Sequence, residues 1–213
     1  MKRQIKTQLK PSIKAVLFDV GGVLIGDIDP PTYAEIARVL GVTPQLEKEA
    51  LEAGMDGLQR GKVSEQEFWS GVAGCLGMAM PPERTRTLWR DMIEKYAVAN
   101  DEVTGIVQRL RKAGYRTGIV SNTEPSHAAY MKESGLLDGF DPIVLSCESG
   151  YVKPESGIFS TALDRLGLPA TKVAYVDDSE ARMAGAKELG MRCHKFTSAI
   201  CLEKFLAGLG VNI

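Results

Sequence analysis

Short apolar runs alternate with helical patterns along most of this chain, and that rhythm restricts the possible folds more than any other feature of the sequence. The runs lie at residues 13–18, 117–120, 142–145, 173–176 and 191–195. Helical periodicity fills the spaces between them, at residues 102–113, 126–134, 157–166 and 179–189, and returns near 199–206. Strands that alternate with helices are joined by crossovers, which make neighbouring strands parallel. The sequence therefore predicts an α/β fold, a parallel sheet in three α/β/α layers.

One long span breaks this rhythm, because it contains helical patterns and no convincing strand. Within it, Ser64-Glu-Gln-Glu fits a capping box at a helix start, and Gly61 suits the end of the helix before it. A further helix is expected from Pro81 to about Tyr96. We therefore expect two parts, a core of residues 11–26 and 100–213 and an inserted helical subdomain of residues 27–99.

Charge and hydropathy argue against several kinds of partner. The 213-residue chain carries 26 Lys and Arg against 27 Asp and Glu, a net charge of −1, so no global field is available to hold a nucleic-acid backbone or an anionic membrane. The basic N-terminus lacks an apolar core of signal-peptide length, and no stretch approaches the length of a membrane span. We expect a cytoplasmic monomer or homodimer without nucleic-acid or membrane partners.

The cysteines are scattered and form no Cys-x-x-Cys pair; they are Cys75, Cys147, Cys193 and Cys201. That spacing argues against a zinc site or a disulfide framework. We expect reduced thiols that fill buried space.

Polar residues follow four of the predicted strands, at the sheet edge where ligands collect in open α/β folds. In chain order they are Asp19 and the glycine pair after it, Ser121-Asn122-Thr123, Lys153 before Pro154, and the acidic pair Asp177-Asp178. Each segment alone also suits an ordinary turn or helix cap. Carboxylates suit Mg²⁺, which prefers oxygen ligands, while hydroxyl, amide and ammonium groups suit phosphate oxygens. Four such segments at four strand ends are much harder to obtain by chance than any one of them.

This arrangement resembles the haloacid dehalogenase superfamily, in which an Asp after the first strand, a Ser or Thr, a Lys and an acidic pair follow in the same order. The similarity covers nearly the whole chain, including KPESGIF from Lys153 and VDDSEARMAGAKELGM from Val176. The resemblance implies a Rossmann-like core, and the helical insertion after Val23 looks like the cap of that superfamily's small-molecule members.

Carried over to these positions, the resemblance implies a phosphatase that acts on a small phosphorylated metabolite. Asp19 is then the nucleophile that forms an aspartyl phosphate, and the catalytic groups Ser121 and Lys153 neutralise the phosphoryl oxygens. Asn122 joins them in binding phosphate. The chemistry agrees with these roles, because a carboxylate with an intrinsic pKa of about 3.9 is already ionised at neutral pH.

The resemblance also implies a Mg²⁺ cofactor. Its expected ligands are Asp19, the Gly21 carbonyl and Asp178, with Asp177 in direct or water-mediated support. Phosphoryl transfer depends mainly on alignment and on stabilising charge over the equatorial oxygens, which a cation and a lysine supply.

Gly21 is the main departure from the family pattern. The superfamily's phosphatases usually carry a second Asp at this position, which protonates the leaving group and then activates water. General acid–base catalysis typically contributes ~10²–10⁴ in rate, so we expect weaker hydrolysis of esters with poor leaving groups. Asp27, Asp29, a substrate group or water are the available replacements.

The same departure leaves two alternatives open. Dehalogenases of the superfamily also lack the second Asp, but they act without metal and do not need the pair Asp177-Asp178, so a phosphatase is preferred. A metal-binding regulatory protein that has lost turnover is the other alternative. Phosphomutases resemble the two-Asp pattern, so Gly21 counts against that activity.

Candidates for substrate contact in the insertion are Arg60, Phe68, Trp69 and Trp89. Aromatic residues at helical spacing are more often core than substrate platform. Arg182 stands where the family often has an Asn; surface placement is the simpler prediction and pairing with an acidic neighbour the alternative. His194 falls in a predicted strand and is expected to be structural, whereas His127 is a candidate for the surroundings of Ser121.

Overall fold

The computed structural model describes residues 13–79 and 87–213. Its sheet contains β1 (Ala15–Phe18), β2 (Arg116–Ser121), β3 (Ile143–Leu145), β4 (Val173–Asp177) and β5 (Arg192–Lys195). The strands lie in the order β3-β2-β1-β4-β5, and every neighbouring pair is parallel. The expected α/β fold with a parallel sheet is therefore confirmed, and each strand coincides with one of the apolar runs.

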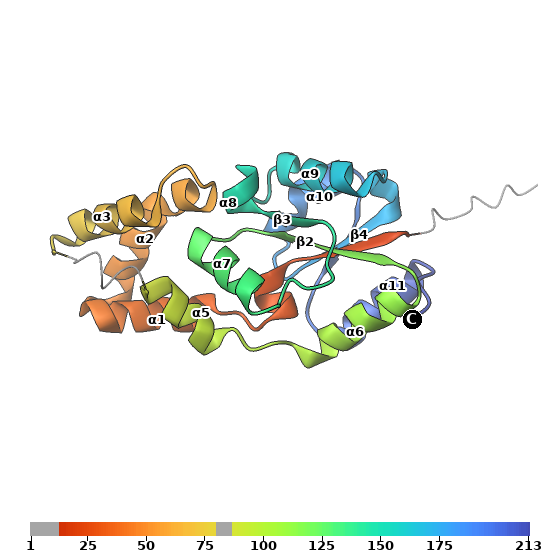
Figure 1. The fold of residues 1–213 in the computed structure, drawn as a ribbon, viewed down its shortest axis with the longest axis horizontal. Coiled ribbons are helices and arrows are strands. Elements are labelled where there is room, and N and C mark those ends of the chain that lie inside the picture. The colour runs from red at the N-terminus through yellow and green to blue at the C-terminus, as the bar shows by residue number, and fades with distance from the viewer. Residues whose placement is uncertain (1–12, 80–86) are drawn as a thin grey trace, which may run out of the picture.

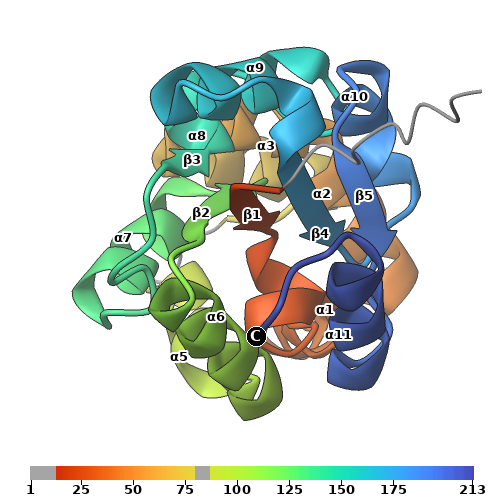
Figure 2. The ribbon, with the colours of Figure 1, turned by 90° about the vertical axis from the view of Figure 1, so that its right-hand side faces the viewer.

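Helices form a layer on each face of the sheet (Figure 2). One layer contains α6 (Asp101–Lys112), α7 (Pro125–Glu133) and α11 (Ala199–Gly208), and the other contains α9 (Ser156–Leu166) and α10 (Ala184–Glu188). Alternate side chains of β1 serve opposite layers, since Phe18 packs with the first layer and Leu17 with the second, and both are fully buried. Burial on two faces explains why the central strands β1 and β4 are mostly apolar, whereas the edge strand β5 is polar and partly exposed.

The predicted helix over residues 179–189 is wrong in its first turn. The chain there forms a short 3₁₀ turn, η3 (Ala181–Met183), before α10 begins. The N–H of Ser179 donates to Asp177 Oδ1 at 2.8 Å, and this bond holds the residues after β4 in a turn. Two further short elements were not predicted, α8 (Ser146–Ser149) and η2 (Ala170–Lys172).

A second group of helices lies beyond one end of the sheet (Figure 1). These helices are α1 (Asp29–Leu40), α2 (Pro44–Gln59), α3 (Glu65–Leu76) and α5 (Leu88–Tyr96). We call residues 29–96 the helical segment; its described residues contain no strand. They enclose a core of their own around Leu58, Trp69 and Trp89. The capping box of Ser64 is present as predicted, while the helix start expected at Pro81 lies outside the described residues.

The cysteine prediction is wrong in part. All four thiols are free, but Cys75 and Cys201 are exposed, and the other two are half-buried. Cys201 lies between the inward-facing residues Ala199 and Leu202 of α11, so it points outward. Among the residues that the structure describes, no helix combines the length and the apolar character that a membrane span requires.

Candidate active site

The sheet has a topological switch point at β1. The chain passes from β1 to β2 on one side, and β4 later joins β1 on its other side. At such a point the loops after the two strands separate and leave a crevice. Asp19 directly follows β1 and Asp177 ends β4, so both carboxylates lie at this crevice. The cleft there measures about 610 Å³ including its open mouth.

The turn after β1, η1 (Val20–Leu24), contains two glycines with different constraints. Gly22 has a φ of 69°, and a Cβ at this position would overlap the carboxylate of Asp178, so a side chain is excluded. Gly21 has φ −63° and ψ 136°, values that other residues adopt, and a Cβ there would meet no atom within 4 Å. The backbone thus requires glycine at 22 but not at 21.

Lys153 places a buried ammonium between two carboxylates. Its Nζ lies 2.7 Å from Asp19 Oδ2 and 2.8 Å from Asp177 Oδ2. The side chain of Asn122 fixes the backbone of this lysine, because its Oδ1 accepts the Lys153 N–H at 2.7 Å and its Nδ2 donates to the Lys153 carbonyl at 3.2 Å. Asn122 therefore positions Lys153, and Ser121 lies beside it at the end of β2.

Tyr175 completes the buried part of the site, and sequence reasoning missed it. Its hydroxyl donates to Asp177 Oδ2 at 2.6 Å, and Lys153 Nζ donates to that hydroxyl at 3.1 Å. A tyrosine inside an apolar strand suggests only core packing. A polar side chain two residues before Asp177, on the same face of β4, is the signal that was available.

The carboxylates around Lys153 respond differently to burial. Burial raises the pKa of Asp19, against the attraction of Lys153. Burial also acts on Asp177, but Lys153 and the Tyr175 and Ser179 hydrogen bonds outweigh it and hold its pKa below the usual range. For Asp178, burial raises the pKa, and the charges of Asp19 and Asp177 raise it further. The ammonium of Lys153 therefore outweighs burial at Asp177, while the pKa values of Asp19 and Asp178 stay raised.

The geometry of this cluster fits a small divalent cation. Oxygen atoms of Asp19, Asp177 and Asp178 lie within 4.8 Å of one another. Asp178 Oδ1 is buried and finds no hydrogen-bond partner among the described residues. A buried acceptor without a donor is costly, and a cation removes that cost. Asp177 accepts bonds on both oxygens, and both oxygens of Asp19 are also engaged, by the Val20 N–H and by Lys153. Asp178, whose Oδ1 accepts no hydrogen bond from the described residues, is therefore the best placed of the three as a direct ligand for Mg²⁺.

Arg182 belongs to the site, which corrects the prediction of simple surface placement. Its Nη1 lies 3.9 Å from Asp19 Oδ2 and 4.0 Å from Asp178 Oδ1, although the side chain is 42% exposed. The turn η3 follows the acidic pair closely enough to bring the guanidinium back over it. The alternative, pairing with acidic neighbours, is the one that the structure bears out.

A second ion pair lines the cleft at the start of α7. His127 lies in the same cleft as Ser121, as expected, while its partner Glu124 was missed by sequence reasoning. His127 Nδ1 lies 2.9 Å from Glu124 Oε2, and Gln59 Nε2 donates to Glu124 Oε1 at 3.1 Å. Burial alone lowers the pKa of His127, but the Glu124 carboxylate outweighs burial and leaves that pKa raised. A Glu and a His three residues apart at a helix start was the available sequence signal.

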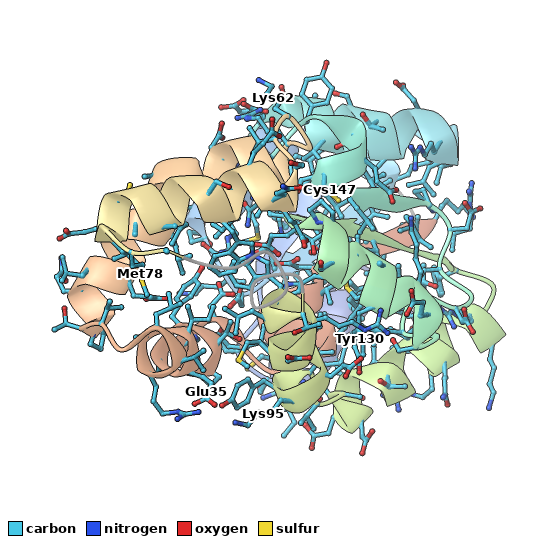
Figure 3. The ribbon with its side chains drawn as sticks, turned by 60° about the vertical axis from the view of Figure 1, so that its left-hand side comes forward. Glu35, Lys62, Met78, Lys95, Tyr130 and Cys147 are labelled. Carbon is cyan, nitrogen blue, oxygen red and sulfur yellow. The ribbon has the colours of Figure 1, made fainter. Side chains whose placement is uncertain are left out.

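The helical segment contacts the sheet-bearing part of the chain at several points. Arg60 Nη2 lies 2.7 Å from Glu155 Oε1, so this candidate for substrate contact joins two parts of the chain instead of lining the cleft. Glu65 accepts the Ser126 N–H at 2.7 Å. Figure 3 shows Cys147 close to the turn that carries Lys62. The segment therefore closes one side of the cleft.

The aromatic candidates are core residues. Phe68, Trp69 and Trp89 pack against one another with ring centroids 5.3–6.1 Å apart, and none of them lines the cleft. His194 lies in β5 and stacks on Phe205 with centroids 4.7 Å apart, so its structural role is as expected.

Comparisons with known proteins identify a family and its fold. A family described as haloacid dehalogenase-like hydrolase matches residues 13–190. The D-ribitol-5-phosphate phosphatase of Bacteroides thetaiotaomicron is 29% identical over 189 residues, which cover 84% of this chain and 89% of that protein.

Two solved structures illustrate the range of chemistry on this fold. A HAD family enzyme of Bacteroides thetaiotaomicron, in complex with magnesium and inorganic phosphate, superposes with a TM-score of 0.69 at 23% identity, covering 87% of this chain and 95% of that one. The L-2-haloacid dehalogenase of Xanthobacter autotrophicus, with chloropropionic acid covalently bound, gives a TM-score of 0.61 at 21% identity, covering 94% and 85%. These likenesses establish the fold alone.

Proposed function

Because this chain belongs to the haloacid dehalogenase-like hydrolases, we propose that it is a Mg²⁺-dependent phosphatase of small phosphorylated metabolites. One observation carries the proposal. Asp19 lies 2.7 Å from a buried ammonium and also within a cluster of three carboxylates whose oxygens fit a cation. A nucleophile beside an ammonium and beside a site that would hold a cation suits attack on a dianionic phosphoryl group.

In the proposed reaction Asp19 attacks phosphorus, the bond to the leaving oxygen breaks, and water then hydrolyses the aspartyl phosphate. Lys153 and Ser121 neutralise the phosphoryl oxygens, and Asn122 positions Lys153 and binds phosphate beside them. Because Lys153 is clamped by Asp177 and Tyr175, its charge needs no reorganisation when the transition state forms.

Asp19, the Gly21 carbonyl and Asp178, with Asp177 in support, would hold Mg²⁺, which would neutralise phosphoryl charge. Within the described part of the chain, Asp178 Oδ1 accepts no hydrogen bond and has only the guanidinium of Arg182 near it as a charged partner, at 4.0 Å. This supports a metal-dependent reaction over a dehalogenase, since a metal-free displacement on a haloacid supplies no further partner for that oxygen.

The helical segment acts as a cap and limits the substrate to the phosphate ester of a small polyol or sugar that carries no charge besides its phosphate. Gln59 reaches the cleft from this segment, and Asp29, Glu124 and His127 line the same wall. These groups exchange hydrogen bonds with hydroxyls, whereas the carboxylates disfavour a second anionic group on the substrate. The name of the Bacteroides relative, a ribitol phosphate phosphatase, agrees with this class.

The test is hydrolysis of p-nitrophenyl phosphate with Mg²⁺ and with EDTA, by the wild type and by Asp19→Asn. We expect metal-dependent activity that falls by roughly 10⁴–10⁶ in the variant, since the nucleophile is lost while shape is kept. Thermal unfolding shows whether the variant remains folded. A panel of polyol phosphates, nucleotides and 2-haloacids follows. Halide release without metal would establish the dehalogenase, and Mg²⁺ binding by calorimetry without any turnover would establish the regulatory protein.

A further inference from the structure

If the proposed function holds, the leaving group needs a proton that Gly21 cannot supply. The space beside Gly21 is open, since a Cβ there meets nothing within 4 Å. An acid supplied from elsewhere must therefore face this space across the cleft. The cleft wall offers four further titratable side chains apart from the groups assigned above, and they differ in how fully they are already bonded; they are Asp27, Asp29, Glu124 and His127.

Glu124 and His127 are committed to each other. Both oxygens of Glu124 accept hydrogen bonds, one from Gln59 and one from His127 Nδ1. Their pairing holds the pKa of Glu124 below its usual range in spite of burial, so this carboxylate carries no proton to give. The second ring nitrogen of His127, Nε2, is buried from solvent, and the ring packs edge-on against Trp89.

Asp27 is also poorly suited. Its Oδ1 accepts the N–H of Asp29 at 3.2 Å. This bond uses the carboxylate to shape the entry into α1. Asp29 differs, because among the described residues no hydrogen bond to its own carboxylate is formed.

Asp29 occupies the first position of α1 and lines the same cleft as Asp19 and Gly21. Arg182, whose Nη1 lies 3.9 Å from Asp19 Oδ2, also acts electrostatically on Asp29. Asp29 is therefore a carboxylate of the same cleft that shares a guanidinium neighbour with the nucleophile.

The surroundings of Asp29 favour its protonated form. Loss of hydration between the cleft walls and the charge of Glu124 raise the pKa of Asp29 to about 6, with a smaller contribution from Asp27. The charges of Arg182 and His127 oppose the rise. Burial raises the pKa of the Tyr33 phenol, one turn along α1, and the negative charge of Asp29 raises that pKa further. An acid that titrates close to neutral pH serves both as donor and as acceptor.

We propose that Asp29 is the general acid and base of this enzyme, supplied by the helical segment in place of the residue missing at position 21. As Asp19 bonds to phosphorus and the ester P–O bond breaks, the Asp29 carboxyl gives its proton to the leaving alkoxide. The Asp29 carboxylate then takes a proton from the water that attacks the aspartyl phosphate. Cleavage of the P–O bond to Asp19 releases phosphate and leaves Asp29 protonated, as it began.

The test compares Asp29→Asn with Asp27→Asn on two substrates, D-ribitol 5-phosphate and p-nitrophenyl phosphate. For Asp29→Asn we expect kcat on the alkyl ester to fall by roughly 10²–10⁴, and on the aryl ester, whose leaving group needs no proton, by less than about tenfold. Asp27→Asn should stay within about threefold of the wild type on both. The descent of kcat/KM above about pH 6 should also disappear in Asp29→Asn.

Gly21→Asp provides the rescue. Added to Asp29→Asn, it should restore turnover of D-ribitol 5-phosphate without changing turnover of the aryl ester. Equal loss on both esters, or no loss on either, in a variant that unfolds at the wild-type temperature would overturn the role of Asp29 while leaving the phosphatase intact. Absence of any Mg²⁺-dependent aryl phosphatase activity in the wild type would overturn the proposed function itself.

Discussion

The floor and the mouth of the cleft differ in how fully their polar groups are bonded. In the floor, Lys153, Asp177 and Tyr175 are buried and bonded to one another. At the mouth, Arg182 is 42% exposed and reaches its carboxylates only at 3.9–4.0 Å, and Asp29 is exposed as well. A closed network is rigid and suits the invariant part of a substrate, the phosphoryl group. Loosely held groups suit the part that varies.

The largest effect should come from breaking the floor with Lys153→Met. Removing the ammonium leaves Asp19 and Asp177 without their shared partner, and loss of one member of a buried ion pair typically costs about 3–5 kcal/mol. Urea unfolding measures this loss, and turnover of p-nitrophenyl phosphate should vanish with it.

Lys95→Met is the matched control. Lys95 pairs with Glu35 at 3.4 Å on the surface of the helical segment, where both residues are visible in Figure 3. Exposed pairs contribute about 0–1 kcal/mol. Equal destabilisation by the two substitutions would contradict the view that the floor is a closed network.

The adjacent glycines Gly21 and Gly22 allow a comparison with a smaller expected effect. Gly22 packs against Asp178, whereas Gly21 faces the open space of the cleft. Gly22→Ala forces a side chain into a positive-φ position and against Asp178, so we expect a loss of about 1–3 kcal/mol and weaker Mg²⁺ binding by calorimetry. Gly21→Ala faces open space in an ordinary conformation and should change the free energy of unfolding by less than about 1 kcal/mol. Reversed results would mean that position 21, not 22, is the constrained one.

The smallest effect on the free energy of unfolding is expected for the pair Glu124 and His127, which lines the cleft. Because the folded-state pKa of His127 is raised, its pairing stabilises the fold fully below the unfolded pKa and less as pH rises through the folded value. The free energy of unfolding should therefore decrease as pH rises above about 6.5. His127→Gln should flatten this dependence in chemical unfolding measured from pH 6 to 9. An unchanged slope would assign the dependence to other groups.

The sequence predicts the centre of the sheet well because β1 and β4 are buried along their whole length and are therefore mostly apolar runs. It also identifies the polar residues after the strands, since the parallel topology brings these loops to one edge. Tyr175 escapes prediction because one partner of its hydroxyl, Lys153, comes from another loop. For Arg182 the sequence leaves surface placement and pairing open, because the choice depends on the turn η3. For His127 it indicates the neighbourhood of Ser121 but not the pair with Glu124, which Gln59 of the helical segment completes.

The contact between Glu65 and Ser126 links residues 61 positions apart in the chain. The Glu65 carboxylate receives the N–H and the hydroxyl of Ser126 in the first turn of α7, so this helix obtains its cap from a distant part of the chain. The Ser126 amide is therefore a local reporter: its hydrogen exchange should be slow while the helical segment is docked, and should quicken whenever docking is lost, before the sheet itself begins to open.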